Sequence, residues 1–305
     1  MKFSRALWAR MQRRLIRHVV VVTVTLACLV ALLCTRPASG ASVVADVMMF
    51  FLLSTLMYQA YVMLVMVGLL FSAGVEVRRK TAHVLGGGVL VVGAWLTATS
   101  AVVVALCVVL LIWLVATRAL PTLEMYRQVS VHRRDGSASW GDLLFPIGLG
   151  ATAMLFGAQS AEWLAAALVL TLADSTAAVV GSRFPGALYR IGRASKSLGG
   201  TTAFFMVAWL SIALVGWVCA PDWPWLACAG VAALATGLEA IASRGADNLV
   251  LPLATAAGLV WISIVPPLAW LIAGTACLMV LAALAVWQRS IGGAAHPDTS
   301  RRTAQ

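Results

Sequence analysis

The feature that most constrains this chain is the recurrence of long apolar runs separated by short charged or Pro/Gly-rich stretches. A helix that crosses the hydrocarbon core of a membrane takes about 20 predominantly apolar residues. Only 11% of the residues are charged and 62% are apolar, which excludes a soluble globular enzyme, a disordered chain and a disulfide scaffold. We therefore predict an all-α, polytopic membrane helix bundle of about ten transmembrane helices. The runs cover residues 19–34, 46–72, 81–97, 99–117, 143–158, 163–181, 199–219, 225–243, 249–265 and 268–287.

The positions of the basic residues predict how these helices are oriented. Cytoplasmic connections of membrane proteins are enriched in Lys and Arg. If the N-terminus is cytoplasmic, all of the 22 basic residues except Arg36 fall on the cytoplasmic side. The net charge of +11 then reflects topology rather than nucleic-acid binding. We predict cytoplasmic N- and C-termini, a bacterial inner-membrane location and an active site on the cytoplasmic face.

The chain divides into three predicted parts. Residues 1–42 form a basic N-terminus with a first transmembrane or signal-anchor segment, residues 43–290 form a single catalytic bundle, and residues 291–305 form a disordered cytoplasmic tail. The sequence from Ala38 to Ala41 also fits the cleavage site of a signal peptide, so cleavage of the first segment stays open. Cleavage would not alter the remaining topology.

Polar residues inside or beside apolar segments are functional candidates because they are costly to keep in a bilayer. Helical spacing places Lys80, His83 and Gly87 on one face, so a cation and an imidazole would point the same way. The alternative for this cluster is a positive-inside anchor and a histidine bonded to a neighbouring helix. Asp142 stands at the start of the segment that opens at Leu143, where it could simply cap a helix.

A second group of polar residues surrounds the connection between residues 181 and 199. Asp174 lies about 10 Å inside its helix and therefore needs a cation, either for catalysis or as a structural partner. Lys196 and Ser197 precede Gly199 and Gly200 at the start of the next helix, where backbone N–H groups favour a phosphate. This arrangement predicts a site for a metal-bound nucleotide.

A third group lies at the connection between residues 239 and 252. Glu239 is about a turn inside its helix, and Asp247 and Asn248 follow on the turn. Mg²⁺ is usually held by carboxylates together with substrate phosphates. Since Asp174, Glu239 and Asp247 share one membrane depth, we predict that they converge on Mg²⁺ or Mn²⁺.

Four motifs in order give the chain a family resemblance. It resembles the superfamily of dolichol kinase, phytol kinase and CTP-dependent diacylglycerol kinase, in its phytol-kinase-like branch. The matching positions are Glu76, Arg79, Lys80 and His83; Gly141, Asp142, Phe145 and Pro146; Asp174, Ala177, Gly181, Gly186, Lys196, Ser197, Gly200 and Thr201; and Glu239, Gly245, Asp247, Asn248, Leu249, Pro252 and Leu253. Two positions depart from the family pattern: Ala173 replaces a glycine, and Gly199 replaces a glutamate whose loss puts metal stoichiometry and donor preference in doubt.

The resemblance implies transfer of the γ-phosphoryl group of CTP, ATP or another nucleoside triphosphate to a membrane-dissolved isoprenoid alcohol such as phytol, farnesol, geranylgeraniol or dolichol. We expect Asp174, Lys196 and His83 to be catalytic, and Asp174, Glu239 and Asp247 to bind the metal. The residues expected to contact the nucleotide phosphates are Arg79, Lys80, Arg193, Ser197, Gly199, Gly200, Thr201 and Asn248.

Two other functions remain open. A cytidylyltransferase that forms a CDP-lipid would use similar parts, but its multiple-aspartate signature is absent from the sequence. A secondary transporter could use Asp174 and Glu239 as ion relays, although transporters generally place such groups near the membrane midplane between repeats.

Overall fold

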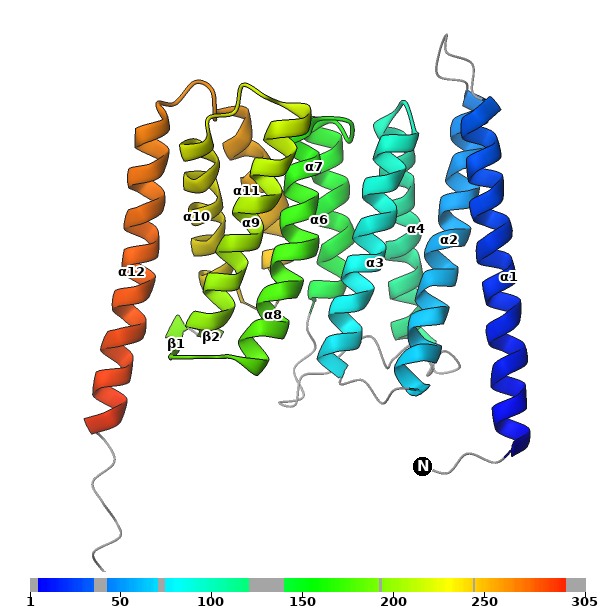
Figure 1. Ribbon diagram of the computed structural model, residues 1–305, viewed down its shortest axis with the longest axis horizontal. Helices are drawn as coiled ribbons and strands as arrows, with labels where there is room; N and C mark the ends of the chain where they lie inside the picture. The colour runs from blue at the N-terminus through cyan, green and yellow to red at the C-terminus, as the bar shows by residue number, and fades with distance from the viewer. Residues whose placement is uncertain are drawn as a thin grey trace, which may run out of the picture.

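The computed structural model describes residues 5–35, 43–70, 75–120, 140–191, 194–243 and 245–294. These residues form a bundle of roughly parallel helical rods, with α1 at one edge and α12 at the other (Figure 1). The predicted all-helical class is confirmed. The helices are α1 (Arg5–Thr35), α2 (Val43–Leu70), α3 (Val75–Leu96), α4 (Ser100–Ala119), α6 (Gly141–Phe156), α7 (Ala161–Leu168), η2 (Val169–Ala173), α8 (Asp174–Arg183), α9 (Leu198–Cys219), α10 (Trp225–Ile241), α11 (Asp247–Val260) and α12 (Pro267–Ala294).

Each of the ten predicted segments coincides with a helical segment of the structure. The elements α7, η2 and α8 follow one another without a break and count as one such segment. Five stretches are long and apolar enough to cross a membrane, which supports an integral membrane protein. They are Val43–Leu64, Ser100–Ala119, Ala161–Arg183, Leu198–Cys219 and Pro267–Gln288. The count of ten crossings and the orientation stay predictions.

The ends of the chain differ from the predicted boundaries. The first helix begins at Arg5, well before residue 19, and so includes most of the basic N-terminal stretch. The candidate cleavage site at residues 38–41 lies outside the described residues. The last helix continues to Ala294, and the rest of the predicted tail, residues 295–305, also lies outside them.

The centre of the bundle is the rod that carries Asp174. Trp163 is fully buried near its start, and its indole N–H donates to the carbonyl oxygen of Leu149 in α6 at 3.1 Å. Small residues allow the neighbouring helices to approach closely, as is usual inside membranes. A side chain at Gly148 would overlap the backbone carbonyl of Asn248, so α6 and α11 meet almost backbone to backbone.

A short antiparallel hairpin joins α8 to α9, where the sequence indicated only a turn rich in Gly and Arg. Strands β1 (Leu188–Ile191) and β2 (Ala194–Ser197) pair so that Tyr189 faces Lys196. Gln288 of α12 holds the hairpin with two hydrogen bonds to the backbone of Arg190, at 2.6 and 2.7 Å. The hairpin lies at the same end of the bundle as the start of α1 and the end of α12 (Figure 1).

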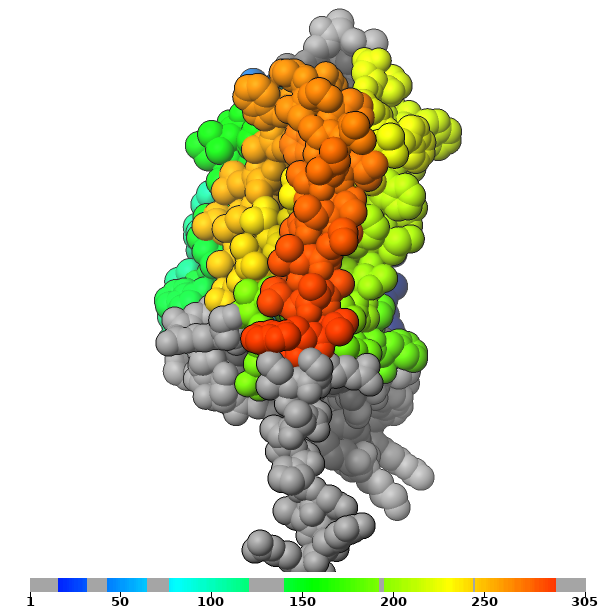
Figure 2. Space-filling view, turned by 90° about the vertical axis from the view of Figure 1, so that its left-hand side faces the viewer, coloured from blue at the N-terminus to red at the C-terminus, as the bar shows by residue number. Residues whose placement is uncertain are grey.

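The outer face of α12 is apolar along its length. Figure 2 shows this helix running the height of the molecule at one end of the bundle. Large side chains that would be costly to expose to water lie on it: Leu268, Ile272, Met279, Val280, Val286 and Trp287. Such a surface is suited to contact with lipid.

Candidate active site

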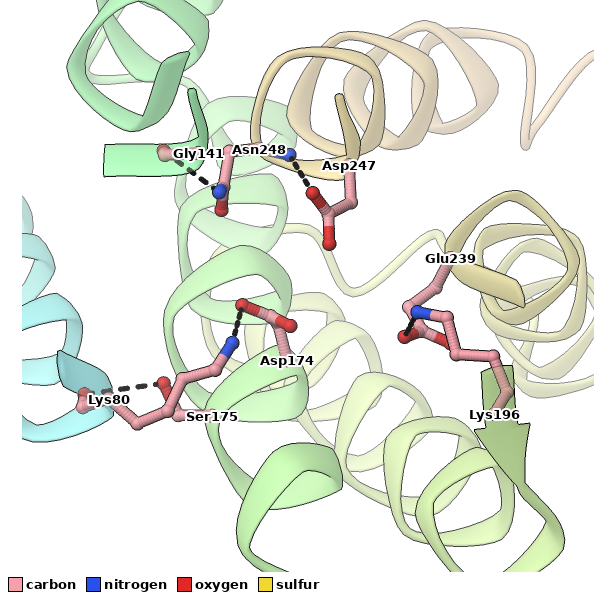
Figure 3. A network of polar contacts seen from close by, with 8 residues as sticks. All are labelled: Lys80, Gly141, Asp174, Ser175, Lys196, Glu239, Asp247 and Asn248. Carbon is pink, nitrogen blue, oxygen red and sulfur yellow. Dashed lines mark hydrogen bonds and ion pairs between the residues drawn. The ribbon is translucent and has the colours of Figure 1, made fainter. Parts of the chain in front are cut away.

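The first element of the site is an ion pair buried inside the bundle. The ammonium of Lys80 in α3 lies 2.5 Å from Oδ2 of Asp174, and their side chains are only 5% and 7% exposed. The hydroxyl of Ser175 also approaches the backbone carbonyl of Lys80, at 3.5 Å (Figure 3). Lys80 therefore supplies the cation that Asp174 needs. The sequence predicted that Lys80 contacts a phosphate of the nucleotide.

A turn of π-helix places this carboxylate. Residues Val169–Ala173 form the turn, and Asp174 follows it directly. A π-turn inserts an extra residue into the helix and is frequent at functional sites, because it shifts the direction of the side chains that follow. No sequence pattern indicated this turn, since its residues form an ordinary apolar run.

A second ion pair lies at the hairpin end of the bundle. Lys196 of β2 contacts the carboxylate of Glu239 in α10, and the two side chains are 21% and 8% exposed. Burial alone would lower the pKa of Lys196, but the carboxylate of Glu239, aided by Asp247 and Asp174, outweighs it and raises that pKa above its usual value. Lys196 is therefore charged at neutral pH.

Asp247 and Asn248 complete the site at the start of α11. Asn248 is buried, and its side-chain N–H donates to the carbonyl oxygen of Gly141 at 2.9 Å, which ties α11 to α6. Asp247 accepts a hydrogen bond from the backbone N–H of Asn248 and forms no ion pair among the described residues. Figure 3 shows Asp174, Asp247 and the Lys196–Glu239 pair pointing toward one another.

The predicted metal ligands are only partly brought together. Within the described ranges, no three His, Cys, Asp or Glu side chains are grouped closely enough to hold a metal ion. Asp174 and Glu239 each pair with a lysine instead, and of the three carboxylates only that of Asp247 has no ion pair with another described residue. Mg²⁺ commonly takes one or two carboxylates and completes its shell with water and substrate phosphates. The donor type therefore suits Mg²⁺ that arrives with a nucleotide.

The backbone N–H groups at the start of α9, where the sequence predicts a phosphate cradle, are hydrogen-bonded within the protein in this structure. The N–H of Gly199 donates to the carbonyl oxygen of Pro185 at 3.0 Å, and the N–H of Gly200 donates to Oγ of Ser197 at 3.1 Å. Thr201 is also engaged, since its hydroxyl lies 2.6 Å from that of Tyr189. These hydrogen bonds hold the hairpin onto α9.

The packing around Gly199 accounts for glycine at this position, where the superfamily that the chain resembles has a glutamate. A Cβ atom at this position would overlap the carbonyl oxygen of Phe184 and lie 3.3 Å from that of Pro185. The family glutamate could not be accommodated here without a shift of the backbone. In this chain the loop at Phe184 and Pro185 fills the space where that side chain would begin.

His83 lies one helical turn beyond Lys80 and is only 6% exposed. Neither of its ring nitrogens has a hydrogen-bond partner among the described residues, and its ring packs 4.6 Å from that of Phe145. The capping role considered for Asp142 is wrong, because α6 begins at Gly141 after Trp140 and no side chain caps it. Asp142 lies inside the first turn and pairs with Arg118, a contact that the sequence did not suggest. Arg193 lies outside the described residues.

One known protein resembles the chain at low identity. A phytol kinase from Synechocystis sp. is 29% identical over 185 residues, which cover 59% of this chain and 77% of the kinase. No family model matches the chain, and no solved structure matches it. The similarity supports a phytol-kinase-like protein at most, and it indicates a kinase whose acceptor is an alcohol.

Proposed function

We propose that this protein is a membrane lipid kinase that transfers the γ-phosphoryl group of CTP or ATP to an isoprenoid alcohol such as phytol, farnesol, geranylgeraniol or dolichol. The observation that carries the proposal is the pair of buried Lys–carboxylate contacts, Lys80–Asp174 and Lys196–Glu239, facing Asp247 at one end of an apolar bundle. The resemblance to phytol kinase supports the same reaction class.

The two lysines are the groups that would bind the triphosphate. Phosphoryl transfer depends mainly on positioning and on neutralising charge at the phosphate oxygens. In the nucleotide-free protein each ammonium is held in place by a carboxylate, so that neither charge is buried alone. When a triphosphate binds, Lys80 and Lys196 would turn toward its oxygens, and Arg79 and Arg193 would add charge at the rim.

The carboxylates released by the two lysines would then be free to coordinate a metal ion. Asp247, with Asp174 or Glu239, would hold Mg²⁺, which neutralises the phosphate charge when bound. Asn248 keeps α11 against α6 and so fixes the position of Asp247.

The reaction itself needs one base and one leaving group. The hydroxyl oxygen of the alcohol forms a bond to the γ-phosphorus, while the bond from that phosphorus to the β,γ-bridging oxygen breaks. The nucleoside diphosphate leaves with the electron pair of the broken bond. The hydroxyl proton passes to His83, whose ring nitrogens are unoccupied, or to Asp174 once it has released Lys80.

The position of the label in the donor tests this function. Purified protein in lipid vesicles is incubated with Mg²⁺, an alcohol, and CTP labelled at either the α- or the γ-phosphorus, with ATP labelled at the γ-phosphorus in parallel. A kinase moves only the γ-label to the lipid, whereas a cytidylyltransferase supplied with a phosphorylated lipid moves the α-label. Absence of γ-label in every lipid with both donors would contradict the proposal.

A further inference from the structure

A cavity of about 170 Å³ lies between α2, α3, α4 and α6, beside the ion-paired centre. Its walls are almost entirely carbon, and several aromatic rings line it. Tyr58 and Tyr61 of α2 both meet Trp113 of α4 edge to face, with ring centroids 5.5 and 6.3 Å apart. Phe145 of α6 forms another part of the wall.

One end of this cavity is polar. Its lining residues include the imidazole of His83 and the charged side chains of Asp142 and Arg79. His83 is more than nine-tenths buried, and neither its two nitrogens nor the buried Oδ2 of Asp142 has a hydrogen-bond partner in the part of the chain that the structure describes. A buried polar group without a hydrogen bond costs about 1–3 kcal/mol. An occupant with a hydroxyl at this end would satisfy His83, whereas a purely hydrocarbon occupant would leave it unpaired.

The polar end adjoins the phosphate-binding lysine. His83 follows Lys80 by three residues on α3, a rise of about 4.5 Å at about 1.5 Å per residue. A hydroxyl bound at His83 would therefore lie next to the Lys80–Asp174 pair. Two other lining residues, Tyr58 and Leu85, are 42% and 38% exposed, so the cavity wall extends to the outer surface of the bundle at these side chains.

Building on the proposed function, we infer that this cavity binds the hydroxyl-bearing end of the isoprenoid acceptor. The hydroxyl lies at His83, the first isoprene units lie among the aromatic side chains, and the rest of the chain passes Tyr58 and Leu85 into the lipid.

The size of the cavity limits what it can recognise. A cavity of about 150 Å³ holds a molecule the size of benzene. The cavity here therefore holds about one or two isoprene units, and the remaining chain is solvated by the bilayer. We expect the enzyme to discriminate between acceptors at the hydroxyl end and to tolerate different total chain lengths.

Gly86 offers a way to fill the cavity. A Cβ atom at Gly86 would meet Leu110 and Phe145, both lining residues, at an ordinary contact distance of 3.9 Å. The rest of a leucine side chain would extend from there into the cavity. Gly88 is the matched control, because a Cβ atom there has nothing within 4 Å. Both substitutions replace a glycine of α3 by the same residue.

The test compares Gly86→Leu with Gly88→Leu in vesicles that contain farnesol or geranylgeraniol. We expect Gly86→Leu to raise the apparent KM for either alcohol by at least about tenfold, the size of effect that a few methylene groups have in an apolar pocket. Its KM for the nucleotide should be unchanged, and Gly88→Leu should behave as the wild type. Wild-type activity together with an unaltered KM in Gly86→Leu would overturn the cavity assignment but not the kinase. A wild type that phosphorylates no alcohol would overturn the kinase and the acceptor site together.

A second measurement does not depend on how the variant folds. Wild-type protein is irradiated with a farnesol analogue that carries a diazirine near the hydroxyl, and the labelled peptides are identified by mass spectrometry. Labelling within residues 54–64, 79–86, 109–114 or 142–145, suppressed by excess farnesol, is the expected result. Labelling confined to other helices would overturn the assignment.

Discussion

At the scale of single residues, the central feature is a pair of opposite charges held away from water. The side chains of Lys80 and Asp174 are almost fully buried and pair directly with each other. Removing one partner of a buried pair leaves an uncompensated charge, whereas replacing both by apolar residues is often neutral. Each of the two charges therefore needs an opposite charge beside it, either its present partner or another ion that replaces that partner.

This coupling predicts a non-additive effect on stability. We expect Lys80→Met and Asp174→Leu to lower the free energy of unfolding by about 3–5 kcal/mol each, while the double variant recovers most of the loss. Thermal or denaturant unfolding in detergent micelles measures all four proteins. Additive losses in the double variant would show that the two side chains are not coupled.

The contact between Lys196 and Glu239 predicts a dependence of stability on pH. Glu239 outweighs burial and raises the pKa of Lys196 above its ordinary value of about 10.4 in the unfolded chain. The stability that this raised pKa contributes is fully present below about pH 10.4 and is lost as the pH rises through the pKa of the folded protein.

Melting temperatures measured from pH 7 to pH 12 test this dependence. The decline above about pH 10.4 should be much smaller in Glu239→Gln than in the wild type, because the carboxylate that raises the pKa of Lys196 in the folded protein is gone. The step should be missing in Lys196→Met. An equally large decline in the wild type and in Glu239→Gln would contradict the assignment.

At the scale of helices, glycine residues allow particular helices to pack closely against each other. A methyl group at Gly87 would overlap the side chain of Thr171 in the π-helical turn, whereas one at Gly88 points into open space. The turn that carries Asp174 is thus packed directly against α3, the helix that carries Lys80 and His83. This close approach fixes the distance between the two halves of the ion pair.

Neighbouring substitutions in α3 test this packing. We expect Gly87→Ala to lower the melting temperature and Gly88→Ala to leave it unchanged or raise it, since alanine is favoured over glycine in a helix by about 1 kcal/mol. Adding Thr171→Ala to Gly87→Ala should restore part of the loss, because it removes the overlapping atoms. Equal melting temperatures for Gly87→Ala and Gly88→Ala would argue against the close contact.

The sequence predicted the helices better than it predicted what lies between them. Apolar runs locate transmembrane helices well because the bilayer demands internal backbone hydrogen bonds. The π-turn at Val169–Ala173 and the hairpin at residues 188–197 had no such signal. Both depend on contacts with distant segments, such as that of Gln288 with Arg190.

The sequence identified the residues of the candidate site but not which of them form ion pairs with each other. The sequence marked Lys80, Asp174, Lys196 and Glu239 because charged residues are costly in apolar segments. It could not tell which lysine would meet which carboxylate, since that depends on how the helices pack. Nor could it show that the Gly199 amide is already bonded to Pro185, because the loop that supplies this acceptor has no regular pattern.

At the scale of the whole molecule, the distribution of charge predicts a fixed orientation. Ser182 at the end of α8 and Asp222 beyond the end of α9 are both exposed, and they lie near opposite ends of α9. In a background in which Cys34 and the exposed Cys28 and Cys219 are serine, we expect Ser182→Cys to react with a membrane-impermeant maleimide from the cytoplasmic side. Asp222→Cys should react only from the other side. Labelling of both from one side would contradict the predicted topology.

The account as a whole rests on one claim, that the buried Lys–carboxylate centre transfers a phosphoryl group to a lipid alcohol. Its most direct test is the initial rate of γ-phosphoryl transfer to geranylgeraniol by the charge-balanced Lys80→Met/Asp174→Leu variant, compared with wild type and with Asp222→Asn at the far end of the bundle. The balanced variant keeps no unpaired charge in the core, so it should remain folded by melting temperature. We predict that its rate falls by at least about 10³-fold, the scale on which loss of charge stabilisation acts, while Asp222→Asn keeps the wild-type rate. A folded variant that retains the wild-type rate would contradict the claim.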